Sequence, residues 1–110
     1  MLSTVDSDTL DLSAYIRGGD RITWGQGTGE PLKLIERLVE QRAAIGDVEV
    51  FLGISLVDTF RSEHFDHIRL ISYGAVGTNA KFVRTGEMDL LPCHFSAVPN
   101  LIGSGQFPID

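Results

Sequence analysis

The chain has 110 residues, of which 43% are hydrophobic and 22% are charged, so it has the size and composition of one globular domain. This balance excludes a disordered, collagenous or coiled-coil chain. The 9 Lys and Arg residues against 15 Asp and Glu give a formal charge of −6, which disfavours non-specific nucleic-acid binding because that binding depends on cationic contacts to phosphate.

The N-terminal part of the sequence predicts a tail, a short helix and a strand. Residues 1–9 are polar and acidic and are expected to form a flexible tail, which leaves residues 10–110 as the folded domain. Apolar side chains at helical spacing, followed by two glycines, predict a helix over residues 10–17. Residues 20–25 then read as a strand with Ile22 and Trp24 on one face.

A glycine-rich loop and an amphipathic helix follow. The loop runs Gly25-Gln26-Gly27-Thr28-Gly29-Glu30-Pro31, and Pro31 suits the first position of a helix. The helix extends to Gly46. Its predicted inner face consists of Leu34, Ile35, Leu38, Val39 and Ala43, and its predicted outer face of Lys33, Glu36, Arg37, Glu40 and Gln41.

The rest of the chain alternates strands with polar or glycine-rich connections. Residues 48–56 form a nearly continuous apolar run, which is typical of a strand covered on both faces. Further strands are predicted over 67–73 and 88–95, with Pro92 marking an edge strand or its end. The connections are a polar loop over 58–66, a glycine-rich turn over 74–79, a short helix over 80–85 and a helical turn over 96–102. This order predicts an α/β fold with a mostly parallel sheet and flanking helices.

The loop from Gly25 to Pro31 is the strongest candidate site, because it follows a strand and opens a helix. Its N–H groups and the helix dipole suit an anion, but a tight structural turn would show the same pattern. The loop has no Lys after its glycines and has Glu30 where a dinucleotide fingerprint requires Gly, so neither nucleotide motif is matched.

A second turn, Gly77-Thr78-Asn79, again lies between a strand and a possible helix. Thr78 and Asn79 are expected either to cap that helix or to donate hydrogen bonds to a ligand. Near the end of the fourth strand, His94 and Ser96 would share one face and could line a site, or belong to the polar layer beside it. Cys93 on the opposite face is expected to be a small buried residue rather than a nucleophile.

No metal site is expected. His64 and His67 stand among carboxylates, and Cys93-His94 could add ligands, but the sequence lacks the repeated ligand pairs typical of metal centres. A polar surface loop explains the segment. The single Cys excludes an intramolecular disulfide framework and, with no visible secretory signal or membrane span, predicts a cytoplasmic location.

Several segments in order resemble the N-terminal domain of the acetyl-CoA hydrolase/transferase family, in the class I coenzyme A transferase superfamily, which includes acetate and 4-hydroxybutyrate CoA-transferases. The resemblance covers about residues 15–105. It rests on residues 17–22, 25–31, 50–53, 72–74, 77–79 and 91–96.

The resemblance implies that coenzyme A is substrate and product rather than a covalently bound cofactor, and that the partners are an acyl-CoA and a small carboxylate. In this family a glutamate attacks the thioester, and CoA passes through a glutamyl-CoA intermediate to a carboxylate or to water. Gly25, Gln26, Gly27, Thr28, Gly29 and Pro31 would form the CoA and oxyanion loop, and Gly77, Thr78 and Asn79 the second loop. No nucleic-acid or membrane partner is expected, and a homo-oligomer is possible.

The family's catalytic glutamate belongs to a C-terminal motif with no counterpart in this sequence. Glu30, Glu49 and Glu87 stand in other contexts. Residues 10–110 are therefore expected to be part of a CoA-transferase N-terminal domain without its catalytic domain, and inactive in isolation. The alternatives are a CoA- or nucleotide-binding module and a structural fragment, both without catalysis.

Overall fold

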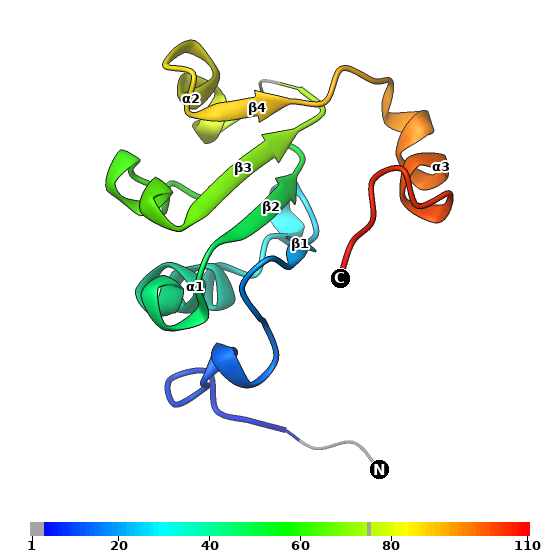
Figure 1. Ribbon diagram of the computed structural model, residues 1–110. Coiled ribbons are helices and arrows are strands. Elements are labelled where there is room, and N and C mark those ends of the chain that lie inside the picture. The colour runs from blue at the N-terminus through cyan, green and yellow to red at the C-terminus, as the bar shows by residue number, and fades with distance from the viewer. Residues whose placement is uncertain (1–3, 75) are drawn as a thin grey trace.

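A four-stranded parallel sheet organises the chain in the computed structural model, which describes residues 4–74 and 76–110. The strands are β1 (Arg21–Thr23), β2 (Val48–Leu52), β3 (Ile68–Ser72) and β4 (Met88–Leu90), and they lie side by side in chain order. Figure 1 shows that their arrows run in the same direction. This confirms the predicted α/β fold.

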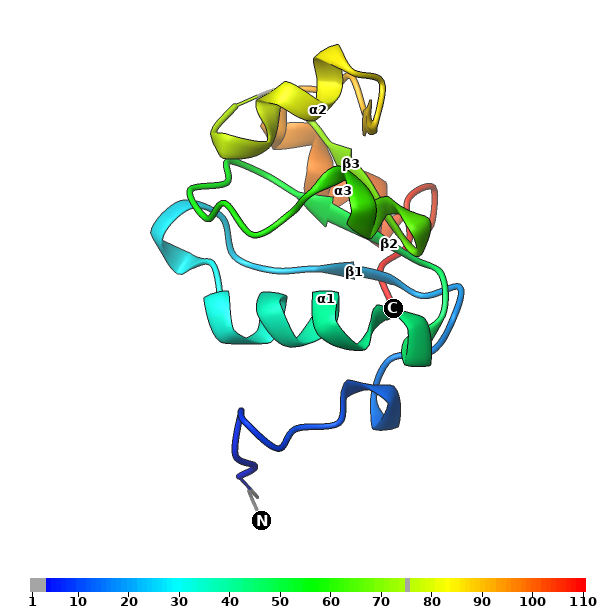
Figure 2. The ribbon, with the colours of Figure 1, turned by 90° about the vertical axis from the view of Figure 1, so that its left-hand side faces the viewer.

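The long helix α1 (Leu32–Ile45) connects β1 to β2 and lies along one face of the sheet (Figure 2). Ile35, Leu38 and Val39 are buried there, as their spacing predicts. Two residues of the predicted inner face, Leu34 and Ala43, are exposed instead. Gly46 ends the helix with φ of 98°, in the left-handed region that favours glycine.

Both faces of the sheet are covered, as predicted for the strand over β2. Val48, Val50 and Leu52 point into the core beneath α1, together with Phe82 from the short helix α2 (Lys81–Arg84). Phe51 points to the other face, where it packs with Ile71, Phe107 and α3 (Val98–Gly103). Alternation along one strand therefore supplies both cores.

Five short 3-10 helices complete the described elements, and two of them correct the predictions. The helix predicted over residues 10–17 is only η1 (Leu12–Ala14). The predicted polar loop over 58–66 contains η3 (Ser62–Asp66) and the fully buried Phe60. The others are η2 (Gly27–Gly29), η4 (Thr78–Ala80) and η5 (Phe95–Ala97).

The segment around η1 is held by α1 as well as by its own hydrogen bonds. Arg37 and Gln41, both predicted to face outward, donate hydrogen bonds to the carbonyl oxygen of Leu10 over 2.8 Å. Gln41 also accepts from the N–H of Leu12. These contacts join residues about thirty positions apart, which local periodicity does not report.

The fourth strand also ends earlier than predicted. β4 stops at Leu90, before Pro92, which lacks the N–H that a ladder requires. Its edge position agrees with the prediction from Pro92. Residues 1–3 of the predicted tail and Ala75 of the glycine-rich turn over 74–79 lie outside the described residues. Within the described ranges, no helix has the length and apolarity needed to cross a membrane.

Candidate functional site

The carboxyl ends of the strands border a recess of about 260 Å³. In parallel α/β sheets this edge is where ligands bind. We call it the carboxyl-edge recess. Its lining is mainly aromatic and aliphatic, and none of the lining residues is charged. They are Thr23, Trp24, Gly25, Gln26, Phe51, Gly53, Tyr73, Phe95, Val98 and Ile102.

The first glycine-rich loop contributes Gly25 and Gln26 to this recess. The Oε1 atom of Gln26 accepts hydrogen bonds from the Tyr73 hydroxyl at 2.6 Å and from the Ile54 N–H at 3.0 Å. In return, the N–H of Gly27 donates to the Ile54 carbonyl at 2.7 Å. The loop is therefore fixed to residues 53–57, the segment after β2, by its main chain and by one side chain.

Part of the loop's hydrogen-bonding capacity is used by the fold. The N–H groups of Gly27, Gly29 and Glu30 donate to carbonyl oxygens within the molecule. Among the described residues, the N–H groups of Gly25, Gln26 and Thr28 have no acceptor. These three are the main-chain donors that the loop can offer a ligand.

Glu30 turns away from the recess and clamps the segment after β2. Its carboxylate accepts hydrogen bonds from the Ser55 hydroxyl at 2.9 Å and from the N–H groups of Leu56 at 2.6 Å and Val57 at 3.2 Å. The carboxylate is thus matched by three donors. Its role in the described structure is to join the first glycine-rich loop to residues 55–57.

The second turn attaches to the same segment from the other side. The N–H of Thr78 donates to the Ser55 carbonyl at 2.8 Å, its hydroxyl oxygen lies 3.2 Å from the same carbonyl oxygen, and Gly77 forms a parallel bridge to Ser55. Thr78 also donates to the Val57 carbonyl. Neither Thr78 nor Asn79 caps a helix through its side chain, so the capping interpretation is wrong. Ser55 links the two predicted loops, but the second turn does not line the carboxyl-edge recess.

Asn79 is the polar group of this turn that the fold leaves unsatisfied. Its side chain is 1% exposed, and neither its Oδ1 nor its Nδ2 atom has a hydrogen-bond partner within the described chain. An unpaired buried amide of this kind costs about 1–3 kcal/mol.

The residues predicted at the end of the fourth strand are arranged differently from expectation. Because the strand stops at Leu90, His94 and Ser96 do not share a strand face. Instead the Nδ1 atom of His94 lies 2.8 Å from the Ser96 hydroxyl and caps η5. Both are exposed, and Phe95 between them lines the recess. Cys93 is half-buried rather than buried.

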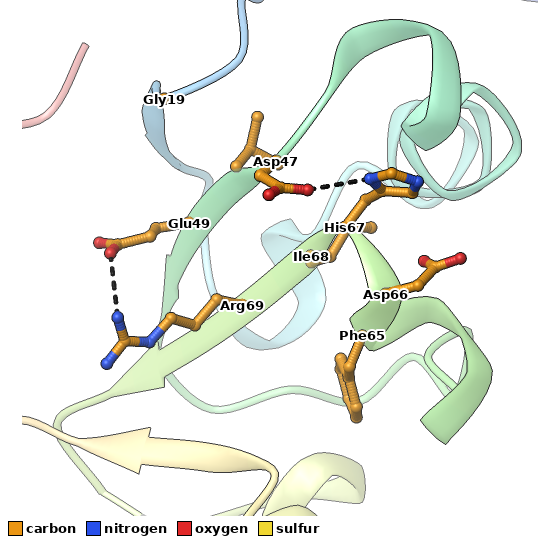
Figure 3. A pocket seen from close by; sticks show the side chains of 9 residues that line it. Gly19, Asp47, Glu49, Phe65, Asp66, His67, Ile68 and Arg69 are labelled. Carbon is orange, nitrogen blue, oxygen red and sulfur yellow. Dashed lines mark hydrogen bonds and ion pairs between the residues drawn. The ribbon is translucent and has the colours of Figure 1, made fainter.

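A second recess, of about 320 Å³, lies at the amino ends of β2 and β3 (Figure 3). Its charged groups are paired within the molecule. Asp47 lies 2.9 Å from Nδ1 of His67, and Glu49 lies 3.4 Å from Nη1 of Arg69. A hydrogen bond from the Arg42 guanidinium lowers the pKa of Asp66 below its usual value. These contacts within the molecule occupy the groups that would otherwise contact a ligand.

The histidine and carboxylate cluster predicted as a surface loop does not assemble metal ligands. In residues 4–74 and 76–110, no three His, Cys, Asp or Glu side chains gather around one point. His64 is buried and accepts a hydrogen bond from the N–H of Arg61 at 3.0 Å. Burial lowers the pKa of His64, and the nearby Arg42 guanidinium adds to this effect.

Sequence reasoning missed Tyr73, Phe95 and Ser55 as residues of the site. Tyr73 orients Gln26, Phe95 closes the recess, and Ser55 joins the two loops. Tyr73 is the last residue of the strand predicted over 67–73, and Ser55 lies near the end of the strand predicted over 48–56, so position near a strand's carboxyl end is the signal that points to them.

Comparison with protein families gives a match over most of the chain. The family model for the acetyl-CoA hydrolase/transferase N-terminal domain matches residues 8–110. No curated protein matches the chain. The matched residues include the glycine-rich loop, the second turn and all four strands. The chain therefore belongs to the acetyl-CoA hydrolase/transferase N-terminal domain family.

Proposed function

We propose that this domain holds the acyl-CoA in an enzyme that transfers coenzyme A from an acyl-CoA to a carboxylate, or to water, through a glutamyl-CoA intermediate. Its contribution is a binding surface rather than the nucleophile. The observation that carries the proposal is the carboxyl-edge recess, in which the glycine-rich loop of the family lies beside an aromatic wall.

The recess has the character of a small-molecule site. Its walls are apolar, and its polar groups are few and held in position, as in most ligand pockets. The free N–H groups of Gly25 and Gln26, which line the recess, suit a thioester carbonyl, whose oxygen gains negative charge when the carbon is attacked. No cation is needed to bind such an oxygen, which agrees with the chain's net charge of −6.

The positions of the glutamates in this chain support the proposal that the catalytic nucleophile comes from elsewhere in the enzyme. None of the six lines the recess. Glu30 holds the segment after β2, Glu49 pairs with Arg21 and Arg69, and Glu87 accepts from Ser62 and Thr85. The remaining three are Glu36 and Glu40 on α1, and Glu63 in η3.

Binding and turnover of the 110-residue chain test this proposal. We expect calorimetry to detect coenzyme A binding, while mass spectrometry with acetyl-CoA and propionate detects no propionyl-CoA above the uncatalysed rate. Turnover that disappears in Glu30→Gln, Glu49→Gln or Glu87→Gln would locate the nucleophile in this chain. Turnover that survives all three would indicate a different chemistry, and no binding of coenzyme A would contradict the binding role.

A further inference from the structure

We propose that the Gln26 side chain recognises the thioester carbonyl and that the carboxyl-edge recess selects uncharged acyl groups larger than acetyl. This inference rests on the proposed function and assigns its substrate class. It depends on one oriented amide, one tyrosine and the absence of charge among the lining residues.

The orientation of the Gln26 amide follows from its partners. The N–H of Ile54 can only donate, so the atom that it contacts at 3.0 Å must be the amide oxygen. The same oxygen accepts from the Tyr73 hydroxyl at 2.6 Å. The amide nitrogen has no acceptor among the described residues, so Gln26 can present two N–H donors to a ligand.

Close packing keeps the amide oxygen in this position. A Cβ atom at Gly53 would lie 2.0 Å from Oε1 of Gln26 and 3.1 Å from the Tyr73 ring. The lack of a side chain at Gly53 therefore makes room for the amide. The Tyr73 hydroxyl and Gly53 have a positioning role, because they act on the ligand through Gln26.

The surrounding wall determines which acyl groups fit. Phe51, Tyr73 and Phe95 form an aromatic row, with ring centroids 6.4 and 5.3 Å apart. The recess of about 260 Å³ is roomier than a two-carbon acetyl group requires. An aliphatic chain gains free energy by burial against this wall, at about 0.8 kcal/mol per CH₂.

The same wall disfavours a charged acyl group. None of the lining residues carries a positive charge, so a carboxylate placed there would lose water without gaining an ionic partner. A succinyl group, which ends in a carboxylate, should therefore gain nothing from the recess. A butyryl group, of the same chain length without the charge, should gain from it.

The test measures affinities of the 110-residue chain for coenzyme A, butyryl-CoA and succinyl-CoA by calorimetry. We expect butyryl-CoA to bind about tenfold more tightly than coenzyme A, and succinyl-CoA no more tightly than coenzyme A. Equal affinities for butyryl-CoA and coenzyme A, or a preference for succinyl-CoA, would overturn the assignment.

Gln26→Glu isolates the amide nitrogen, because it keeps the accepting oxygen and removes the donors. We expect the preference for butyryl-CoA over coenzyme A to fall about fivefold, with a smaller fall in Tyr73→Phe. Gln106→Glu introduces the same charge at an exposed position outside the recess and should leave the preference unchanged. A preference that survives Gln26→Glu would overturn the role of Gln26.

A butyryl thioester of N-acetylcysteamine, which lacks the nucleotide, separates this inference from the proposed function. If that compound binds and loses affinity in Gln26→Glu while coenzyme A does not bind, the acyl recess stands and the CoA-binding role fails. If coenzyme A binds but neither thioester gains from Gln26, the CoA-binding role stands and the inference fails. If none of the compounds binds, both fail.

Discussion

Two glycines near the site, Gly53 and Gly77, leave no room for a Cβ atom, but for different reasons. Replacing each by Ala distinguishes the two reasons. At Gly77, φ is +92° and an added Cβ would lie 2.0 Å from the Ser55 carbonyl oxygen, which is main chain. At Gly53, the added Cβ would meet the end of the Gln26 side chain, which can move. Of these two positions, only Gly77 would place a substituted residue in a strained backbone conformation.

We predict that Gly77→Ala lowers the free energy of unfolding by more than about 2 kcal/mol, and Gly53→Ala by about 1 kcal/mol or less. Urea denaturation measures both. Gly53→Ala should nevertheless lose the hydrogen bond between Tyr73 and Gln26, seen as a change in the NMR signals of Ile54 and Tyr73. Equal destabilisation by the two substitutions would contradict this account.

His64 makes the stability of the fold depend on pH. Burial lowers its pKa in the folded chain below the ordinary value of 6.5, so the unfolded chain binds the proton more readily. Its neutral Nδ1 atom also accepts the Arg61 N–H, which a protonated ring cannot do. The neutral form is therefore favoured above pH 6.5, and stability is lost as the pH falls through and below that value.

Thermal unfolding between about pH 7.5 and about pH 5.5 measures this loss. We predict a melting temperature that decreases over this range in the wild type and a shallower decrease in His64→Asn, whose Oδ1 atom can still accept the Arg61 N–H. A decrease of the same slope in both proteins would show that His64 is not its source.

At the scale of elements, the loop before α1 and the segment after β2 are joined through Glu30. Replacing Glu30 by Ala removes the acceptor of three hydrogen bonds at Ser55, Leu56 and Val57. We predict a loss of about 2 kcal/mol of stability, with faster amide exchange at Leu56 and Val57. Glu36→Ala, in α1, should cost less than about 0.5 kcal/mol because no hydrogen bond to its carboxylate is described. Unchanged exchange in Glu30→Ala would contradict the clamp.

Elements with a strong period are those that the sequence predicts well. The apolar spacing of α1, the continuous apolar run of β2 and the alternation of β3 report local geometry, and both faces of β2 are buried as expected. The short η1 and the buried Phe60 depend instead on distant partners. The N–H of Leu12 in η1 donates to Gln41, and the ring of Trp24 stacks on Phe60. No local pattern contains that information.

The candidate site divides in the same way. The first loop could be predicted because three alternate glycines before Pro31 are visible in the sequence. The pairing of Gln26 with Tyr73 joins residues 47 positions apart. It follows from the parallel order of β1, β2 and β3, which brings their carboxyl ends together. The placement of Thr78 on Ser55 rather than on its own helix has the same origin.

At the scale of the whole molecule, the C-terminal segment closes the face of the sheet opposite α1. Phe107 is buried against Phe51 at a centroid distance of 5.1 Å, and the Arg21 guanidinium lies 3.9 Å from its ring. The N–H of Asp110 then donates to the Arg21 carbonyl at 2.8 Å. The first strand and the last residues therefore stabilise each other.

We predict that Phe107→Ala destabilises the chain by about 3 kcal/mol, because it leaves a cavity in the second core. Phe95→Ala provides the matched control. Phe95 is 56% exposed, so its removal should cost less than about 1 kcal/mol while weakening ligand binding at the recess. Similar losses of stability in the two variants, measured by urea denaturation, would contradict this description of the second core.

The central claim is that the ligand of this domain binds at the carboxyl ends of the strands and not at the amino ends. A ¹H–¹⁵N NMR titration of the 110-residue chain with butyryl-CoA tests it directly. We predict that the shifted amides include Gly25, Gln26, Gly53 and Tyr73, which border the carboxyl-edge recess. Shifts confined to Asp47, His67 and Arg69, in the recess of Figure 3, would contradict the claim.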